Sequence, residues 1–338
     1  MDEENLLDSH PDLADPEWRK HAQTDAWLGA KKDRRRARRP RNGRARQWGL
    51  AAFVLVLAVT TAIVIGIGQR SAEHVGSSSD VVPATVNPTS VSRSAPVHLD
   101  HAYAGTPADV WKKGIDGITS PAPAAVGTFK ADEVAAAYAQ VKQAITAGRL
   151  DPAVLEKHDT QAFLGLFAKD AQAFVGPALT TEPSADGKTP GRSAYVTELA
   201  EGYHLLDQGP RTLGSMRAHP GEKPGELAID VKFVIAYAFD HPRPQELDGP
   251  GEIVSFLRSD EQYVVRAGKS FAPGSRGLWP DGGNSFYQSI GCAALDKGFL
   301  APGYSNPSTA GLPGDDKELP GAYDPNLPVP EEDTCTRK

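Results

Sequence analysis

The sequence lacks the short motifs that mark the common enzyme classes. It contains no G-x-S-x-G or S-x-x-K serine motif, no H-E-x-x-H metalloprotease motif and no P-loop. The G-x-G at Gly66–Gly68 lies in an apolar run and precedes no βαβ unit, so it does not indicate a dinucleotide site. His98-Leu99-Asp100-His101 resembles a short metal clip, but it lies in a proline-broken segment without supporting side chains. We therefore assign no catalytic residue, no cofactor and no metal ligand.

Charged side chains are missing from Gly49–Gly68, a run of twenty mostly large apolar residues. As a helix rising 1.5 Å per residue, this run is about 30 Å long, which matches the hydrocarbon thickness of a bilayer. The alternative is a buried core helix, but core helices are seldom apolar on all faces over such a length. The sequence therefore predicts one transmembrane helix at 49–68.

The two flanks of this run differ sharply in charge. Ten basic residues lie between Lys31 and Arg46, whereas Arg70 alone follows the run closely. The positive-inside rule places the basic flank in the cytoplasm, so we expect a single-pass cell-membrane protein with an extracytoplasmic C-terminal part. A cleaved signal peptide does not fit, because the 48 residues before the run are too many.

Cysteine is scarce, and both copies fall on the predicted outer side. Cys292 and Cys335 are the only two in 338 residues. Because oxidation is permitted outside the cytoplasm, we interpret them as one disulfide that holds the C-terminal tail to the folded part. The alternative is two separate thiols.

The remaining composition divides the chain into segments. The net charge of −7 argues against nucleic-acid binding by the whole chain, and contact with anionic lipid explains the basic cluster. Residues 1–48 are expected to be a disordered cytoplasmic tail, in which Trp18 and Trp27 either form a small docking helix or are incidental. We place a Pro/Ser/Gly-rich linker at 69–127, a folded domain at 128–302 and a proline-rich tail at 303–338.

The folded domain begins with helical periodicity and continues with strand periodicity. Apolar residues recur at helical spacing over 132–147, a short helix restarts at Asp151-Pro152, and a third is expected from Thr160 until Gly176-Pro177. From Leu227 to Phe239 the apolar residues alternate strictly, which predicts a long strand. This order predicts an α+β domain, with N-terminal helices packed on a curved antiparallel sheet.

Further strands are expected around this long one. Thr212–Ala218 should pair with it through the turn at 220–225. Glu252–Arg258 and Gln262–Ala267 should form a second hairpin that turns at Ser259-Asp260-Glu261.

Four residues are candidates for a binding pocket. Asp230 and Lys232 share one face of the long strand, where they either line a cavity or form an ordinary surface pair. Trp279 lies in the glycine-rich stretch 275–284, which is either a ligand-contacting loop or a connection whose tryptophan plugs the sheet. His204 is the fourth candidate.

Three short stretches carry a resemblance. They are Tyr263-Val264-Val265-Arg266, Gly277-Leu278-Trp279-Pro280 and Lys297-Gly298-Phe299-Leu300-Ala301-Pro302. These stretches are similar to membrane-anchored extracytoplasmic proteins of high-GC Gram-positive bacteria, most of them uncharacterised, over about residues 128–305. The order of helices and strands resembles the NTF2-like cone fold. The resemblance implies no activity and no catalytic residues.

Three classes of function remain. The first is a non-enzymatic envelope protein whose outer domain binds a protein or a cell-wall component, and the absence of catalytic motifs favours it. The second is a cell-envelope enzyme of unrecognised type, whose cone-like pocket would hold several ionisable groups with shifted pKa values. The third is a signalling or assembly device that acts through the cytoplasmic tail.

Overall fold

The computed structural model describes residues 90–91, 95–184, 191–306, 321–330 and 335. The chain divides into two units, and all of these residues belong to the second, 84–338. The expected cytoplasmic tail and the expected membrane span at 49–68 lie outside the described residues. Within the described ranges, no helix combines the length and the apolar character that crossing a membrane requires.

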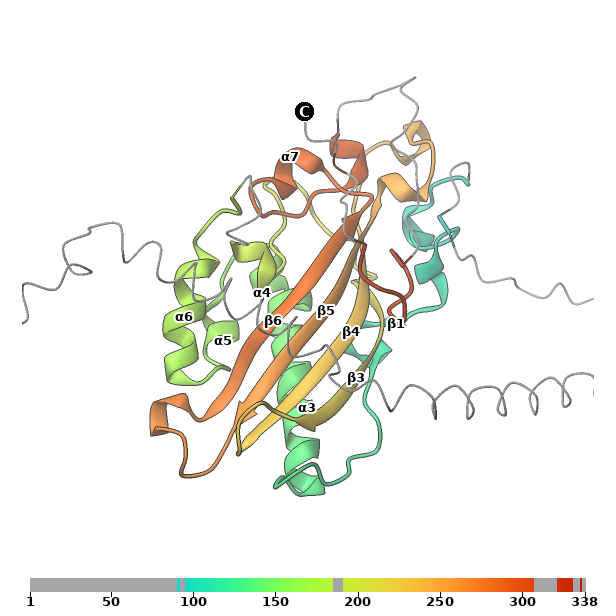
Figure 1. The fold of residues 1–338 in the computed structure, drawn as a ribbon. Coiled ribbons are helices and arrows are strands. Elements are labelled where there is room, and N and C mark those ends of the chain that lie inside the picture. Colours follow the sequence, from blue (N-terminus) through green and yellow to red (C-terminus); the bar gives the residue numbers. More distant parts are fainter. Residues whose placement is uncertain (1–89, 92–94, 185–190, 307–320, 331–334, 336–338) are drawn as a thin grey trace, which may run out of the picture. The chain divides into compact units, whose positions relative to one another are not determined.

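A six-stranded sheet forms the centre of the described unit (Figure 1). In spatial order its main path is β1 (Lys112–Lys113), β3 (Arg211–Pro220), β4 (Glu226–Ala238), β5 (Val254–Arg266) and β6 (Gly277–Gln288). Neighbours on this path are antiparallel, and β2 (Ile118–Thr119) pairs parallel with β3. The expected long strand and its pairing with the strand before it are therefore confirmed.

Strand β4 is buried on both faces over much of its length. Its odd-numbered apolar residues, from Leu227 to Tyr237, pack in one core with the helices. Val234, Ala236 and Ala238 point to the opposite side and pack in a second core. Below, we call these the helix face and the open face of the sheet.

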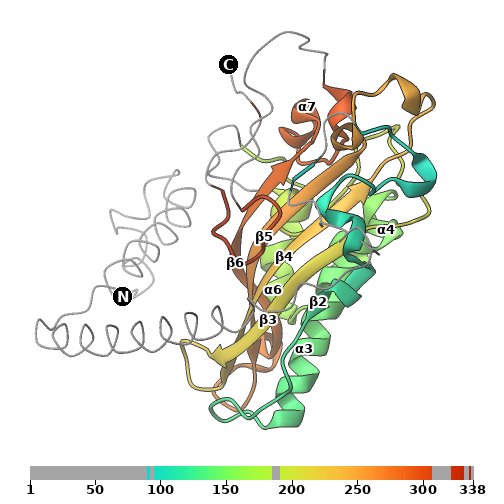
Figure 2. The same ribbon diagram turned by 90° about the vertical axis from the view of Figure 1, so that its right-hand side faces the viewer.

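The α-helices that precede β3 lie on the helix face, as Figures 1 and 2 show in green. They are α3 (Ala131–Ile145), α4 (Pro152–Leu155), α5 (Gln161–Leu164) and α6 (Lys169–Leu179), and a π-helical turn over Thr146–Leu150 extends α3. The short α7 (Cys292–Leu295) follows β6. Helices before an antiparallel sheet confirm the α+β class.

The third expected helix is wrong in two respects. It is split into α5 and α6, because the backbone N–H of Ala168 donates to the carbonyl of Leu278 at 2.9 Å and draws the chain onto β6. It also does not stop at Gly176-Pro177. Pro177 removes only one backbone donor, and α6 continues to Leu179, whose side chain is buried in the core.

The folded part begins earlier than the expected boundary at Thr128. Val97, Tyr103 and Ala108 are buried against the open face, and β1 and β2 add to the edge of β3. The Tyr103 hydroxyl donates to the carbonyl of Gly209 at 2.7 Å. The prolines and glycines of this stretch therefore shape tight turns in a packed segment, which replaces the second half of the expected linker.

The expected hairpin at Ser259-Asp260-Glu261 is also wrong. Strand β5 runs unbroken through these residues, and each of the three pairs with a β4 residue. The stretch 275–284, expected to be a loop, contributes most of β6. The polar residues do not form a turn because they have ionic partners on both faces of the sheet, as described below.

The C-terminal residues return to the folded part. The Cys292–Cys335 disulfide is confirmed, with the two Cα atoms 5.5 Å apart. Cys335 itself is buried. Residues 321–330 lie on the open face, on the side of the sheet away from α3 (Figure 1).

Candidate functional site

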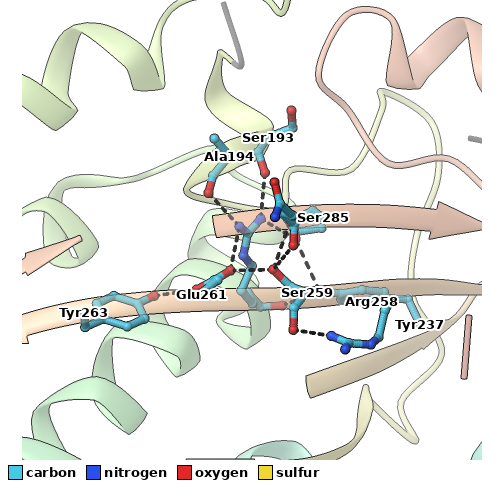
Figure 3. A network of polar contacts seen from close by, with 11 residues as sticks. Ser193, Ala194, Tyr237, Arg258, Ser259, Glu261, Tyr263 and Ser285 are labelled. Atoms are coloured by element: carbon cyan, nitrogen blue, oxygen red, sulfur yellow. Dashed lines mark hydrogen bonds and ion pairs between the residues drawn. The ribbon is translucent and has the colours of Figure 1, made fainter. Parts of the chain in front are cut away.

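A buried ion pair lies between the helices and the sheet (Figure 3). Arg149 comes from the π-helical turn and Glu261 from the middle of β5, and their Nη2 and Oε1 atoms are 3.1 Å apart. The side chain of Arg149 is 1% exposed. Its guanidinium also donates to the carbonyls of Ser193 and Ala194, both at 3.0 Å. A buried cation needs such partners, because leaving water is costly for a charge.

The carboxylate of Glu261 is satisfied on both oxygens. The Tyr263 hydroxyl donates to Oε2 at 2.7 Å, and the Ser259 hydroxyl lies 3.2 Å from Oε1. Ser259 in turn is 2.9 Å from the hydroxyl of Ser285 on β6, which is exposed. The network therefore reaches from the core to the outer edge of the sheet.

Three tyrosines around the pair stay protonated. Burial raises the pKa of Tyr237 and Tyr287, and it raises that of Tyr263 well above 10.0, with the charge of Glu261 adding to the effect. Burial is the largest single effect and by itself would lower the pKa of Arg149, but the charge of Glu261 and the three neighbouring tyrosines together outweigh it, so the net direction is upward. The site therefore contains one guanidinium that stays charged, three neutral tyrosine hydroxyls and one carboxylate.

This arrangement connects three parts of the fold. Arg149 joins the end of α3, the turn at 192–194 and β5, and the Tyr237 hydroxyl donates to the carbonyl of Arg149 at 3.1 Å. Since both carboxylate oxygens and both terminal guanidinium nitrogens have partners within the chain, the network stabilises the packing of the helices on the sheet. The sequence interpretation missed it because Arg149 follows a helix-ending glycine and Glu261 was expected in a turn.

Asp230 and Lys232, predicted as candidates, lie on the open face. Asp230 accepts a hydrogen bond from Gln262 Nε2 at 2.6 Å, and its other oxygen lies 3.1 Å from His219 Nε2. Lys232 is exposed. Both residues project from a sheet surface that is accessible to solvent.

Trp279 lies in strand β6 and is half-buried. Its indole N–H donates to the carbonyl of Ser275 at 2.8 Å, and the guanidinium of Arg266 lies 4.0 Å from the ring centroid. Arg266 is held by Glu226, with Nε and Oε1 3.1 Å apart. The tryptophan is thus a packed strand residue under a paired arginine.

His204 lies apart from the other three candidates. It is exposed, in the segment before β3, and its carbonyl accepts from the N–H of Asp240 just after β4 ends. Asp230 is near the start of β4, so the length of the strand separates them. The structure therefore brings Asp230, Lys232 and Trp279 to one face but leaves His204 outside that surface.

An exposed polar strip runs across three strands of the open face. Register and side-chain alternation place the following side chains on it. They are Arg217 and His219 from β3, Asp230 and Lys232 from β4, and Gln262 from β5. Arg217 also lines an open groove of about 610 Å³ where β2 meets β3, together with Thr119, Ser120, Pro121, Ser215 and Met216. We call the five residues from Arg217 to Gln262 the polar strip.

The described residues offer no obvious metal centre. Across those ranges, no three or more His, Cys, Asp or Glu side chains gather as a metal ion requires. In the clip-like stretch, His101 Nε2 lies 3.7 Å from Asp100 Oδ2, and both side chains are 79% exposed.

Comparison of the chain with protein-family models, with curated proteins and with solved structures finds no match. The argument for function therefore depends on the chain's own residues and their geometry.

Proposed function

We propose that this chain is a membrane-anchored, extracytoplasmic binding protein of the bacterial envelope, which contacts a partner through the polar strip on its open sheet face. The observation that carries the proposal is the difference between the two faces of one sheet. On the helix face, both terminal nitrogens of Arg149 and both carboxylate oxygens of Glu261 have partners within the chain. On the open face, Arg217 and Lys232 remain exposed.

The composition of the strip indicates the kind of partner. It carries two cations, a carboxylate, an imidazole and an amide, spread over neighbouring strands at β-sheet spacing. Such a mixed surface favours specificity and fast association with a polar protein surface more than it favours insertion into lipid. We therefore propose a protein partner, with a cell-wall glycan as the alternative that the experiment must separate.

Two features support the extracytoplasmic placement. The Cys292–Cys335 disulfide suits an oxidising compartment. The basic cluster before the apolar run at 49–68 favours a cytoplasmic N-terminus. Helices on one face of an antiparallel sheet also agree with the NTF2-like element order, which leaves the opposite face for contacts.

Site-specific crosslinking in intact cells tests the proposal. A photo-crosslinking residue at position 232 should give a discrete protein adduct, whereas the same residue at Lys169, exposed on α6 of the opposite layer, should give none. Arg217→Glu should reduce the adduct at position 232, because it reverses a charge within the strip. To test a cell-wall glycan as the partner, purified peptidoglycan is mixed with the purified chain, and the amount of chain that sediments with it is measured.

The outcomes of these experiments distinguish a protein partner from a cell-wall glycan. Equal adducts at positions 232 and 169, or none at either, would count against a protein partner at the strip. Sedimentation with peptidoglycan that Arg217→Glu abolishes would assign the strip to the cell wall instead.

A further inference from the structure

The C-terminal segment 321–330, which we call the strap, is packed on the open face of the sheet (Figure 1). Ala322 and Pro325 are buried, and the ring of Tyr323 meets Phe256 of β5 edge to face, with centroids 4.7 Å apart. Other strap side chains face solvent, among them Leu327 at 42% exposure. The strap is therefore attached at a few points and leaves much of its surface free.

A buried arginine holds the backbone of the strap. Arg258 of β5 is 0% exposed, and its Nη2 donates to the carbonyls of Pro325 and Leu327, at 3.1 and 2.9 Å. These carbonyls belong to a turn over residues 324–327, in which the N–H of Leu327 donates to the carbonyl of Asp324 at 3.2 Å, so the guanidinium binds the backbone of a turn and not a particular side chain. Recognition of this kind tolerates many sequences.

We propose that the surface beneath the strap is a binding site for proline-containing peptides of other proteins that form a turn like that at residues 324–327, and that the strap is its occupant in cis. The aromatic preference follows from a row of rings. Trp111 and Tyr323 both meet Phe256 edge to face, at 6.0 and 4.7 Å. The peptide class is therefore one with an aromatic residue two positions before a proline, as Tyr323 precedes Pro325.

The preference for proline has a separate cause. Arg258 supplies donors for peptide carbonyls, so a bound segment must find acceptors for its own N–H groups. Prolines at 325, 328 and 330 remove three such donors from the strap. One buried acceptor on this face remains open, because Gln288 Oε1, opposite Phe256 in the register, has no hydrogen-bond partner among the described residues.

The site does not depend on the strap for its shape. Without the strap, Arg258 would keep Asp260, whose Oδ1 lies 2.6 Å from Nη1, and the carbonyl of Ser259 at 2.6 Å. The cation would thus stay oriented for the next peptide. The strap competes strongly only because the chain and the disulfide at Cys335 hold it at high effective concentration. This inference does not depend on the partner proposed for the polar strip.

Binding of a labelled peptide to the purified full-length chain tests the inference. The probe is a fluorescent decapeptide with the sequence of residues 321–330, followed by anisotropy. Tyr323→Ala weakens the cis occupant, so it should tighten probe binding about ten-fold relative to the unchanged chain. Leu327→Ala, in the same segment but with an exposed side chain, should leave binding unchanged. Arg258→Lys, added to Tyr323→Ala, should abolish most of the gain, since an ammonium does not span two carbonyls.

Several results would overturn the inference. One is that the unchanged chain and Tyr323→Ala bind the probe equally. Another is that a probe with alanine in place of its tyrosine binds as well as the original probe. Concentration-dependent dimers of Tyr323→Ala that bind no probe would show that a second copy is the occupant. Because the decisive result is a gain of binding, a loss of folding does not imitate it. Crosslinking at position 232 is unaffected by these outcomes, so the two proposals fail separately.

Discussion

Replacement of Glu261 by glutamine should destabilise the fold far more than its single charge suggests. The substitution keeps the shape of the side chain but removes the anion from Arg149, whose side chain is 1% exposed. Removing one member of a buried pair costs about 3–5 kcal/mol, because the other charge remains buried without compensation. For a unit of this size, a destabilisation of 3–5 kcal/mol lowers the unfolding midpoint by roughly 10 °C.

Thermal unfolding of the purified chain, followed by near-UV circular dichroism, measures this effect. Glu246→Gln is the matched control, because Glu246 pairs with Arg243 at 2.9 Å on the surface, where the two side chains are 51% and 65% exposed. The control should change stability by less than about 1 kcal/mol. The reasoning is refuted if Glu261→Gln stays within about 1 kcal/mol of the unchanged chain, or if both substitutions are equally costly.

The remaining predictions concern the disulfide and the tyrosines. Cys335→Ser opens a loop with a sequence separation of 43 and should cost about 4 kcal/mol, seen as a lower urea midpoint that reductant no longer changes. Burial raises the pKa values of Tyr237, Tyr263 and Tyr287 above 10.0, so the folded state holds protons that the unfolded state releases. Stability is therefore full below about pH 10 and falls as the pH rises further. Phenolate absorbance of the native protein at about pH 11 should show fewer ionised tyrosines than the same protein in denaturant, and equal absorbance would contradict the assignment.

Elements with a regular apolar period were predictable from the sequence. In β4, apolar residues alternate from Leu227 onward, and each residue of the core-facing set is buried against the helices. The same holds for α3, where Val134, Tyr138, Val141 and Ile145 are buried. In both cases one face of a single element is buried. Apolar residues therefore recur in the local sequence at the period of that element.

Elements that depend on distant partners were not predictable in the same way. The segment from Val97 to Ile118 has few apolar residues and many breakers, and it folds because β3 offers it an edge and β4 a second apolar face. Strand β6 has exposed glycines at 282 and 283, and β5 supplies its hydrogen bonds. Such a segment shows no regular apolar repeat in its own sequence, because it is ordered by its contacts with the sheet it joins.

The triplet Ser259-Asp260-Glu261 shows how one polar stretch serves both faces of a sheet. Side chains alternate along β5, so Glu261 points to the helix face and meets Arg149, while Asp260 points to the open face and meets Arg258. Each buried arginine thus finds its anion in adjacent positions of one strand. The polar stretch that suggested a turn supplies the anions that two buried cations require. These cations are Arg149 within the core and Arg258 beneath the strap. The centre of β5 therefore contributes both to the stability of the core and to the shape of the proposed peptide site.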